Sequence, residues 1–385
     1  MIRYLSGGES HGPELTVIVE GFPSQLKVSK EIIDEQLKKR QQGYGRGLRM
    51  KIESDQVEIT SGVRFGYTLG SPITMHVVNR DFSHWTDKMA VWDSPPESLK
   101  EIHRPRPGHA DLAGAIKYDH RDIRNVLERA SARNTATMVA AGALARQLLA
   151  AFNIQVTAHV VEIGSVKAQS VPRDWAELVA TADASPVRTA DKDAESKMMA
   201  LIDEAKANGD TVGGVFEIVI QGCPIGLGSY VHPDRKLDGR LAGALMSIQA
   251  IKGVEIGLGF EAARRFGSKV HDPIAHDGSR YMRPSNGAGG LEGGVTNGEP
   301  IVLRVAMKPI STLYKPLNSV DMVTKQVEPA AVERSDYCAV PAASVVGENV
   351  AAWVIADAFL EKFGNDSMDQ IRDAYNAYLE RVKQR

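Results

Sequence analysis

The chain has 385 residues, of which 43% are hydrophobic and 24% charged, a globular composition whose formal net charge of −2 excludes the overall positive field that attracts nucleic acid. Its two cysteines, Cys223 and Cys338, lie far apart in the sequence, so we expect neither a disulfide framework nor a zinc ribbon. We identify no apolar run of membrane-spanning length and no signal-peptide core, and we therefore expect a soluble cytoplasmic protein that does not associate with membranes.

Apolar residues recur with the period of strands in some segments and of helices in others. Ser29 is expected to cap a helix that carries Ile32, Ile33 and Leu37 and ends near Gly43. The charged, proline-interrupted segment 165–208 is predicted to be an outer excursion. The remaining predicted strands are 15–20, 57–60, 73–78, 155–163, 215–221 and 301–307, and the remaining predicted helices are 132–152, 237–251, 348–363 and 368–382.

The strands alternate between apolar and polar residues, which favours antiparallel sheets over a doubly wound parallel sheet. The segment 132–152 is rich in alanine and apolar almost all round, which indicates a buried helix. A buried helix needs cover on more than one side. The sequence therefore predicts an α+β sandwich with helices packed between antiparallel sheets. No domain boundary is evident, so residues 1–385 are treated as a single domain.

A glycine-rich loop, residues 7–12, precedes the first predicted strand and contains Ser10 and His11. Glycines let the backbone approach a ligand closely. Ser10 and His11 are neighbours whose side chains should diverge, so we do not expect them to form a nucleophile and base together. A second glycine-rich segment, 42–50, contributes Arg46 and Arg49 and follows Arg40; it is either a plain helix-terminating loop or a phosphate contact.

The segment 103–111, His-Arg-Pro-Arg-Pro-Gly-His-Ala-Asp, is the most informative stretch of the chain. Two prolines and a glycine predict a stiff loop. It gathers Arg104, Arg106, His109 and Asp111. Arginine forks suit phosphate and carboxylate oxygens, and a histidine can move a proton near neutral pH. The loop is thus expected to hold an anionic small molecule and act on it.

Further polar groups lie at the ends of predicted elements. Arg129 and Arg133 flank Ser131 at the start of the buried helix, where an anion is favoured. Ser131 by itself is more typical of a simple N-cap, but the two arginines favour a ligand there. Arg334 and Asp336 precede the next buried helix. Five glycines in 286–294 indicate either a chain wrapped around a flat ligand or a linker. The two His-Asp pairs near residue 275 are predicted to lie in a solvated loop, and no metal site is expected.

Six of these segments resemble the signatures of the chorismate synthase family, in the family order: 8–12, 45–50, 106–111, 129–133, 249–255 and 336–341. Ala130 stands where many members have serine, which leaves Ser131 as the hydroxyl there. The resemblance implies a β-α-β sandwich with helices between antiparallel four-stranded sheets, assembled as a homotetramer. It also implies a lyase that converts 5-enolpyruvylshikimate 3-phosphate to chorismate and phosphate by an anti 1,4-elimination. This is the last common step to the aromatic amino acids.

The reaction of that family needs reduced FMN without net redox change, and NADPH or an outside flavin reductase is the implied source of reduction. By resemblance, His11 protonates the leaving phosphate, and His109 lies at the N1–C2=O edge of the flavin. Asp336 works with flavin N5, where the C6 hydrogen is removed; alternatively, Asp336 only orients Arg334. Ser10 and Ser131 support proton transfer.

The resemblance also implies binding residues. The flavin-contacting positions are Arg129, Ala130, Ser131, Gln249, Ala250, Gly293, Lys308, Pro309, Ile310, Ser311, Thr312 and Arg334. The substrate-binding positions are Arg40, Arg46, Arg49, Arg106, Arg133 and Arg334, of which Arg40 and Arg46 align with NADPH positions of the family. Two other functions stay open: a phosphate-ester hydrolase that uses His11 and His109 without flavin, and a flavin- or nucleotide-binding module without chemistry.

Overall fold

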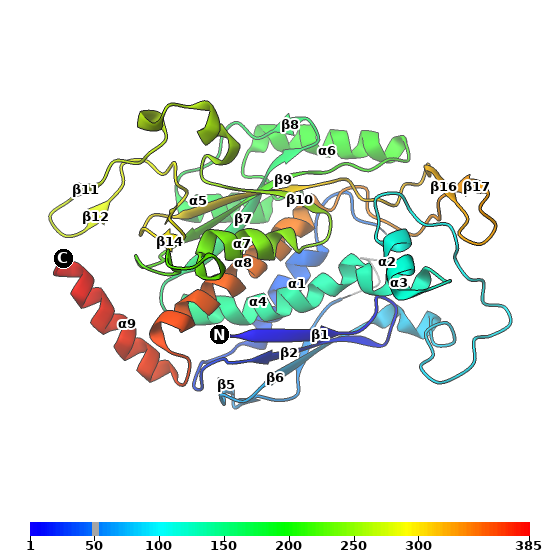
Figure 1. The fold of residues 1–385 in the computed structure, drawn as a ribbon, viewed down its shortest axis with the longest axis horizontal. Coiled ribbons are helices and arrows are strands. Elements are labelled where there is room, and N and C mark those ends of the chain that lie inside the picture. Colours follow the sequence, from blue (N-terminus) through cyan, green and yellow to red (C-terminus); the bar gives the residue numbers. More distant parts are fainter. Residues whose placement is uncertain (48–53) are drawn as a thin grey trace.

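Two antiparallel sheets enclose a layer of helices (Figure 1). The computed structural model describes residues 1–47 and 54–385, so Arg49 lies outside the described residues. The first sheet has the order β1 (Arg3–Gly7), β2 (Glu14–Glu20), β6 (Ile73–Val78) and β3 (Val57–Ile59). The second has the order β10 (Ile251–Ile256), β15 (Ile301–Met307), β9 (Gly214–Gln221), β7 (Gln155–Ile163) and β8 (Val166–Lys167).

In most strands alternate residues are buried, so that each sheet turns one buried face toward the helices; β7 is the exception, because its residues 156–160 are all buried. In β2, Leu15, Val17 and Val19 are buried, whereas Ile18 between them is exposed on the outer face. In β15, Ile301, Leu303 and Val305 point inward in the same way. The buried faces of both sheets meet the helical layer, and this contact forms the main core.

The enclosed layer consists of α1 (Lys30–Gln41), α4 (Thr135–Ala150), α7 (Leu237–Met246) and α8 (Val340–Phe363). α4 and α8 pack closely because Gly142 has no side chain; a Cβ there would lie 2.3 Å from the carbonyl oxygen of Asn349. α8 has 24 residues and is apolar enough to cross a membrane, but it lies buried in the core here. The prediction that no apolar run reaches that length is therefore wrong for α8.

The α+β sandwich is confirmed, and three predicted strands, β6, β7 and β15, have the bounds that alternation predicted. The second sheet has a fifth strand, β8, of only two residues. Ser29 caps α1, although Ile32 is exposed and only Ile33 and Leu37 are buried. The predicted helix 237–251 ends at Met246, and β10, in which burial does not alternate, was not predicted.

Other elements surround the sandwich. The predicted excursion 165–208 contains two helices whose apolar faces contact the edge of the second sheet, α5 (Trp175–Ala184) and α6 (Lys192–Ala207). The glycine-rich segment 286–294 is neither a linker nor open loop, because it contains β13 and leads through a tight turn into β14. The remaining strands are β4 (Val63–Arg64), β5 (Tyr67–Thr68), β11 (Ala275–His276), β12 (Tyr281–Met282), β13 (Leu291–Glu292), β14 (Val295–Thr296), β16 (Asn318–Val320) and β17 (Val327–Pro329).

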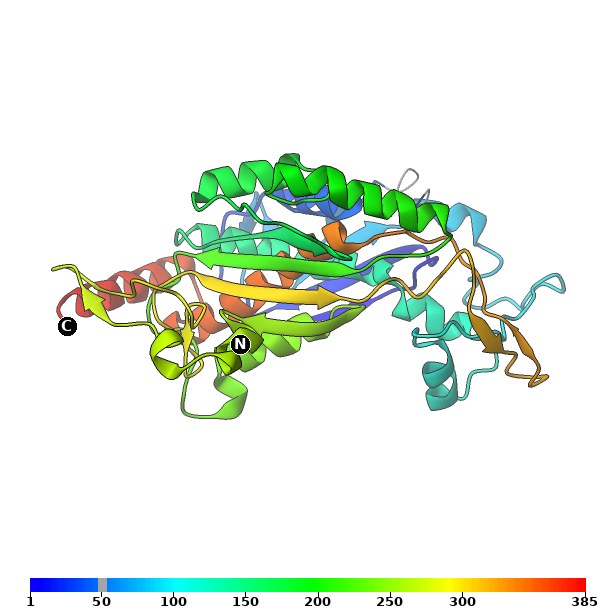
Figure 2. The same ribbon diagram turned by 90° about the horizontal axis from the view of Figure 1, so that it is seen from above.

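The functional loops collect at one end of the long axis. Figure 2 shows α9 (Met368–Lys383) at one end of the molecule and the β16–β17 hairpin at the other. The second end also holds α2 (Asp111–Tyr118) and α3 (Arg124–Ala130). The 3₁₀ helices are η2 (Arg80–His84), η3 (Ala132–Asn134), η4 (Pro233–Arg235), η5 (Gly259–Arg264) and η6 (Gly267–Lys269).

Candidate active site

A cavity of about 430 Å³ opens where the N-termini of α4 and α8 meet the loops of that end. Its volume is within the range of small-molecule sites. The loops that the sequence singled out are far apart along the chain, and the fold brings them together here. The predicted residues that line the cavity are Ser10, His11, Arg40, Arg46, Arg106, His109, Ala130, Ser131, Arg133, Gln249, Ala250, Lys308, Ile310, Ser311, Thr312, Arg334 and Asp336.

Three of the predicted flavin-binding residues do not line this cavity. Arg129 is turned away and donates to the carbonyl oxygens of Ser6 and Gly8, so it braces the β1–β2 loop. Pro309 is absent from the lining although both of its neighbours belong to it. Gly293 lies in the turn between β13 and β14 and is not among the residues that line the cavity. Its flavin contact therefore stays a prediction that the lining of this cavity does not support.

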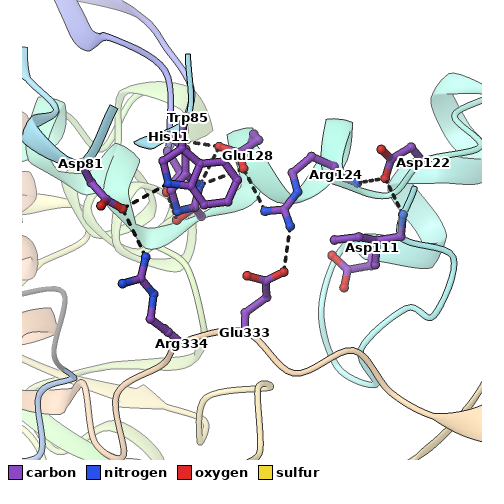
Figure 3. Close-up of polar contacts among 12 residues, drawn as sticks. His11, Asp81, Trp85, Asp111, Asp122, Arg124, Glu128, Glu333 and Arg334 are labelled. Atoms are coloured by element: carbon purple, nitrogen blue, oxygen red, sulfur yellow. Dashed lines mark hydrogen bonds and ion pairs between the residues drawn. The ribbon is translucent and has the colours of Figure 1, made fainter. Parts of the chain in front are cut away.

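His11 lies in the loop between β1 and β2, where a buried glutamate holds it (Figure 3). Its Nδ1 lies 2.9 Å from Glu128 Oε1, and its backbone N–H donates to Glu128 Oε2 at 2.8 Å. Burial raises the pKa of the Glu128 carboxyl, but hydrogen bonds from His11 and the charge of Arg124 outweigh it and lower the pKa below its ordinary value. Glu128 is therefore ionised at neutral pH.

Trp85 covers one face of the His11 ring. The two ring centroids are 3.9 Å apart and the planes differ by 30°. Trp85 Nε1 donates to Asp81 Oδ2 at 3.3 Å, and the guanidinium of Arg124 lies 5.1 Å from the indole centroid. Asp81 also pairs with Arg334 at 3.3 Å. The indole is thus held in place by charged groups on several elements (Figure 3).

His109 and Arg106 share one buried carboxylate at the start of α2. His109 Nδ1 lies 2.5 Å from Asp111 Oδ1, and Arg106 Nε donates to Asp111 Oδ2 at 2.8 Å. Burial raises the pKa of the Asp111 carboxyl, but hydrogen bonds from His109 and Arg106 lower it well below its ordinary range. Arg106 also donates through Nη1 to Thr312 Oγ1 at 2.9 Å. The loop therefore fixes its charges before any ligand arrives.

Arg40 and Arg133 meet at a second buried carboxylate, Asp55. Arg133 Nη1 lies 2.6 and 2.7 Å from the two Asp55 oxygens, and Arg40 Nη1 lies 3.3 Å from Oδ2. Arg40 also donates through Nε to Thr135 Oγ1 at 2.8 Å. Burial lowers the pKa of Arg40 to about 10, with a further lowering by the neighbouring cations, so the side chain stays charged at neutral pH. Asp55 thus joins the end of α1 to the start of α4.

Asp336 pairs with Arg46 and not with Arg334. Arg46 Nη1 lies 2.7 Å from Asp336 Oδ2, and the backbone N–H of Gly47 donates to Oδ1 at 2.6 Å. The alternative prediction that Asp336 orients Arg334 is therefore wrong about the partner, because Arg334 pairs with Asp81.

Both predicted serines meet across the cavity wall. Ser131 Oγ donates to Ser10 Oγ at 3.1 Å, and it also accepts from the backbone N–H of Arg133 as the N-cap of η3. The two predicted roles of Ser131 are thus compatible.

The loop after β15 faces the 103–111 loop. Lys308 Nζ and Ser311 Oγ both donate to the carbonyl oxygen of Gly108, at 2.8 and 2.9 Å. Gly108 has φ +78°, and a Cβ there would lie 3.4 Å from Ser311 Oγ, so glycine suits this close approach. Beside them, Gln249 Oε1 is buried without a hydrogen-bond partner among the described residues, and Ala250 has φ +67°. Such features cluster at ligand sites.

The sequence reasoning missed the acidic and aromatic partners of the site. Asp55 and Glu128 are single carboxylates in mixed polar segments, with no periodicity or spacing that sets them apart. Glu128 directly precedes the Arg129 motif, and this adjacency was the only signal available. Trp85 and Arg124 likewise become recognisable only through their contacts with His11 and Glu128, and Asp81 only through its hydrogen bond with Trp85 (Figure 3).

Comparisons with known proteins agree with the motifs. The family model described as chorismate synthase matches residues 2–360. Chorismate synthase of Geobacter metallireducens is 57% identical over 100% of both chains, and chorismate synthase 1 of Bacillus cereus is 58% identical over 97% of each. A crystal structure of chorismate synthase has a TM-score of 0.80 and 44% identity, covering 100% of this chain and 99% of that one. These similarities confirm the resemblance in sequence and in fold: the chain belongs to the chorismate synthase family, whose members are lyases of aromatic amino acid biosynthesis.

Proposed function

We propose that the cavity binds 5-enolpyruvylshikimate 3-phosphate together with reduced FMN and catalyses the anti 1,4-elimination that yields chorismate and phosphate. The C3–O bond to phosphate and a C6–H bond break, and a second ring double bond forms. The observation that carries the proposal is the pairing of two carboxylate-bound histidines, His11 and His109, with a set of buried guanidiniums around one cavity.

The charge of the cavity suits a substrate with two carboxylates and a phosphate. Arg40 and Arg133 share a single carboxylate, Asp55, which leaves an excess of positive charge on that side. Lys308 donates to neutral oxygens, so its charge is also available to an anion. Because these cations are already fixed by hydrogen bonds, little reorganisation is needed when the substrate arrives.

His11 is proposed to donate a proton to the leaving phosphate. Its Nδ1 lies 2.9 Å from the Glu128 carboxylate, which holds the ring by that edge. Ser10 and Ser131, which hydrogen-bond to each other, are proposed to support this transfer from the same loop and from η3.

Asp336 is proposed to be the carboxylate at which the C6 proton is finally held. Arg46 and the Gly47 N–H hold this carboxylate in place through an ion pair and a hydrogen bond. His109, held by Asp111, is proposed to contact the ring edge of the flavin. Arg334, with its side chain 55% exposed and paired with Asp81, is proposed to contact either ligand.

The residues present fit reduced FMN. The unpartnered amide oxygen of Gln249, the glycine cradle at Gly108 and the cation of Lys308 are groups that a polar ring and a phosphate can engage. When bound, reduced FMN supplies electron density that assists phosphate departure. Arg40 and Arg46 are proposed to serve the substrate, because the Arg40 guanidinium is enclosed by Thr135 and Asp55. We also propose that an outside reductase supplies the reduced FMN, and that the protein is a cytoplasmic homotetramer.

An anaerobic assay tests this function. The protein is mixed with chemically reduced FMN and 5-enolpyruvylshikimate 3-phosphate, and chorismate absorbance and phosphate release are followed together. We expect equimolar products only with reduced FMN. Phosphate without chorismate identifies the hydrolase, and flavin binding without turnover identifies the binding module.

A pair of variants tests the site within this assay. His11→Asn should lower turnover by about 100-fold or more, the scale of a positioned general acid. His232→Asn is the matched control, because His232 is paired with the exposed Asp234 and does not line the cavity. Equal turnover in both variants would remove His11 from the mechanism.

A further inference from the structure

We propose that Glu128 is a positioning residue that fixes the His11 ring with Nδ1–H directed at its carboxylate, so that Nε2 is the nitrogen that carries the transferable proton. The identity of the acceptor, the leaving phosphate, rests on the proposed function. The orientation of the ring does not, because it follows from contacts within the chain.

Three contacts join the two residues. His11 Nδ1 lies 2.9 and 3.1 Å from the Glu128 oxygens, and the His11 backbone N–H donates to Oε2 at 2.8 Å. Fixing the backbone and the ring with one carboxylate leaves the imidazole little freedom about its side-chain torsions. The contact is also dry, since the side chains of His11 and Glu128 are 10% and 2% exposed.

Because Glu128 is ionised, we can infer which nitrogen of His11 carries the hydrogen in this contact. An ionised carboxylate can only accept hydrogen bonds. The Arg124 guanidinium lies 3.3 Å from Glu128 Oε1, four residues away on the same helix, and favours this ionised form. The nitrogen that faces Glu128 must therefore carry hydrogen, and the neutral ring is the Nδ1–H tautomer. When the ring gains a second proton, that proton resides on Nε2.

The face of the ring is fixed as well. Trp85 stacks on it at 3.9 Å, and the indole is held by its hydrogen bond to Asp81 and by Arg124. A ring flip about the bond to Cβ would need the stack to open. The carboxylate at one edge and the indole on one face thus define a single orientation of His11 (Figure 3).

The network returns to the loop that carries Asp336. Arg124 donates to Glu333 at 3.0 Å, and the adjacent Arg334 pairs with Asp81. A connected set of side-chain contacts therefore surrounds His11 (Figure 3). Its members are Glu128, Arg124, Glu333, Arg334, Asp81 and Trp85. These contacts connect His11, the proposed acid, to the segment that bears Asp336, the proposed proton acceptor.

The first test uses the wild-type protein with ¹⁵N-labelled histidine. At a pH where His11 is neutral, ring ¹⁵N–¹H correlations report its tautomer, and His11→Asn assigns the signal. We expect the Nδ1–H form. A predominant Nε2–H form would overturn the proposal without any variant of Glu128.

The second test is Glu128→Gln, which keeps the shape of the side chain but can also donate to Nδ1. We expect a mixture of tautomers and a kcat lower by roughly 10- to 100-fold, short of the full loss of a general acid. The KM for 5-enolpyruvylshikimate 3-phosphate should change by less than about threefold. Glu128→Asp, which keeps the charge, should retain the Nδ1–H tautomer and recover part of kcat.

Glu217→Gln is the matched control. Glu217 pairs with the fully buried His159 at 3.2 Å, on strands of the second sheet outside the cavity. This variant should leave kcat unchanged. Equal losses in Glu128→Gln and Glu217→Gln, or unchanged kcat and tautomer in Glu128→Gln, would overturn the proposal. If the wild-type protein forms no chorismate, the proposed function fails, while the tautomer measurement still decides the role of Glu128.

Discussion

Asp55→Asn probes the electrostatic frame of the site most directly. Asp55 is buried, and it neutralises two guanidiniums that are themselves almost fully buried, Arg133 and Arg40. The amide keeps one acceptor oxygen but removes the negative charge. It therefore leaves two adjacent cations without a compensating anion in a dry environment.

The magnitude follows from this geometry. Breaking a buried ion pair by removing one partner costs about 3–5 kcal/mol, and the acceptor oxygen that the amide retains places the expected loss near the lower figure. For a chain of 385 residues, about 3 kcal/mol corresponds to a fall in Tm of roughly 4 °C if unfolding is two-state. Sulfate should stabilise the variant more than the wild-type protein, because an anion can take the place of the lost charge.

The assay is urea or thermal unfolding of the ligand-free protein, with and without sulfate. Asp369→Asn is the control, since Asp369 and Arg372 form an exposed pair on α9 that should contribute little. A loss below about 1 kcal/mol in Asp55→Asn, or equal effects of sulfate on the variant and the wild-type protein, would refute the reasoning that Asp55 is the shared counter-charge.

Three further predictions concern individual groups. Asp336→Asn should bind substrate normally but turn over at least about 100-fold more slowly, with a larger isotope effect from deuterium at C6; weaker binding with intact turnover would contradict a role as base. Arg106→Ala should weaken substrate more than flavin in titrations, and unchanged substrate affinity would place the pocket elsewhere. Because the folded pKa of Asp111 is depressed, its stabilisation is present above its unfolded pKa of about 3.9 and is lost as pH falls below it. The unfolding free energies of wild-type and Asp111→Asn protein should thus converge only below about pH 4, and a constant difference down to about pH 2 would refute this.

The fold was predictable where one physical signal dominated. Alternation over six residues gave β6 correctly, because a sheet with one buried face imposes that period. The bounds of β7 were also predicted correctly, although its residues 156–160 are buried on both faces. α8 begins at Val340, eight residues before the predicted start, and its first turn contains Pro341, a position where proline is tolerated. α6 was missed because its buried residues, Ala194, Met198 and Ile202, are diluted by charges.

The site was predictable only in part, for a similar reason. Arginine and histidine in glycine- or proline-rich loops are unusual enough to be noticed, and those residues do line the cavity. Their carboxylate partners come from other parts of the chain: Glu128 lies 117 residues from His11, and Asp55 lies 78 residues from Arg133. Such pairs form only when the chain folds, so no local sequence pattern predicts them.

These partners also change what the arginines contribute. Arg106, Arg46 and Arg334 each lie against a carboxylate, so the cavity attracts an anion less strongly than the number of its guanidiniums suggests. In return, each fork is held in one orientation before binding, and a substrate oxygen meets donors that need not be reordered. Removal of an arginine therefore costs attraction, whereas removal of its carboxylate costs orientation. Loss of the carboxylate should therefore lower turnover more than substrate affinity. The same result is expected for Glu128→Gln, which should lower kcat and leave KM almost unchanged.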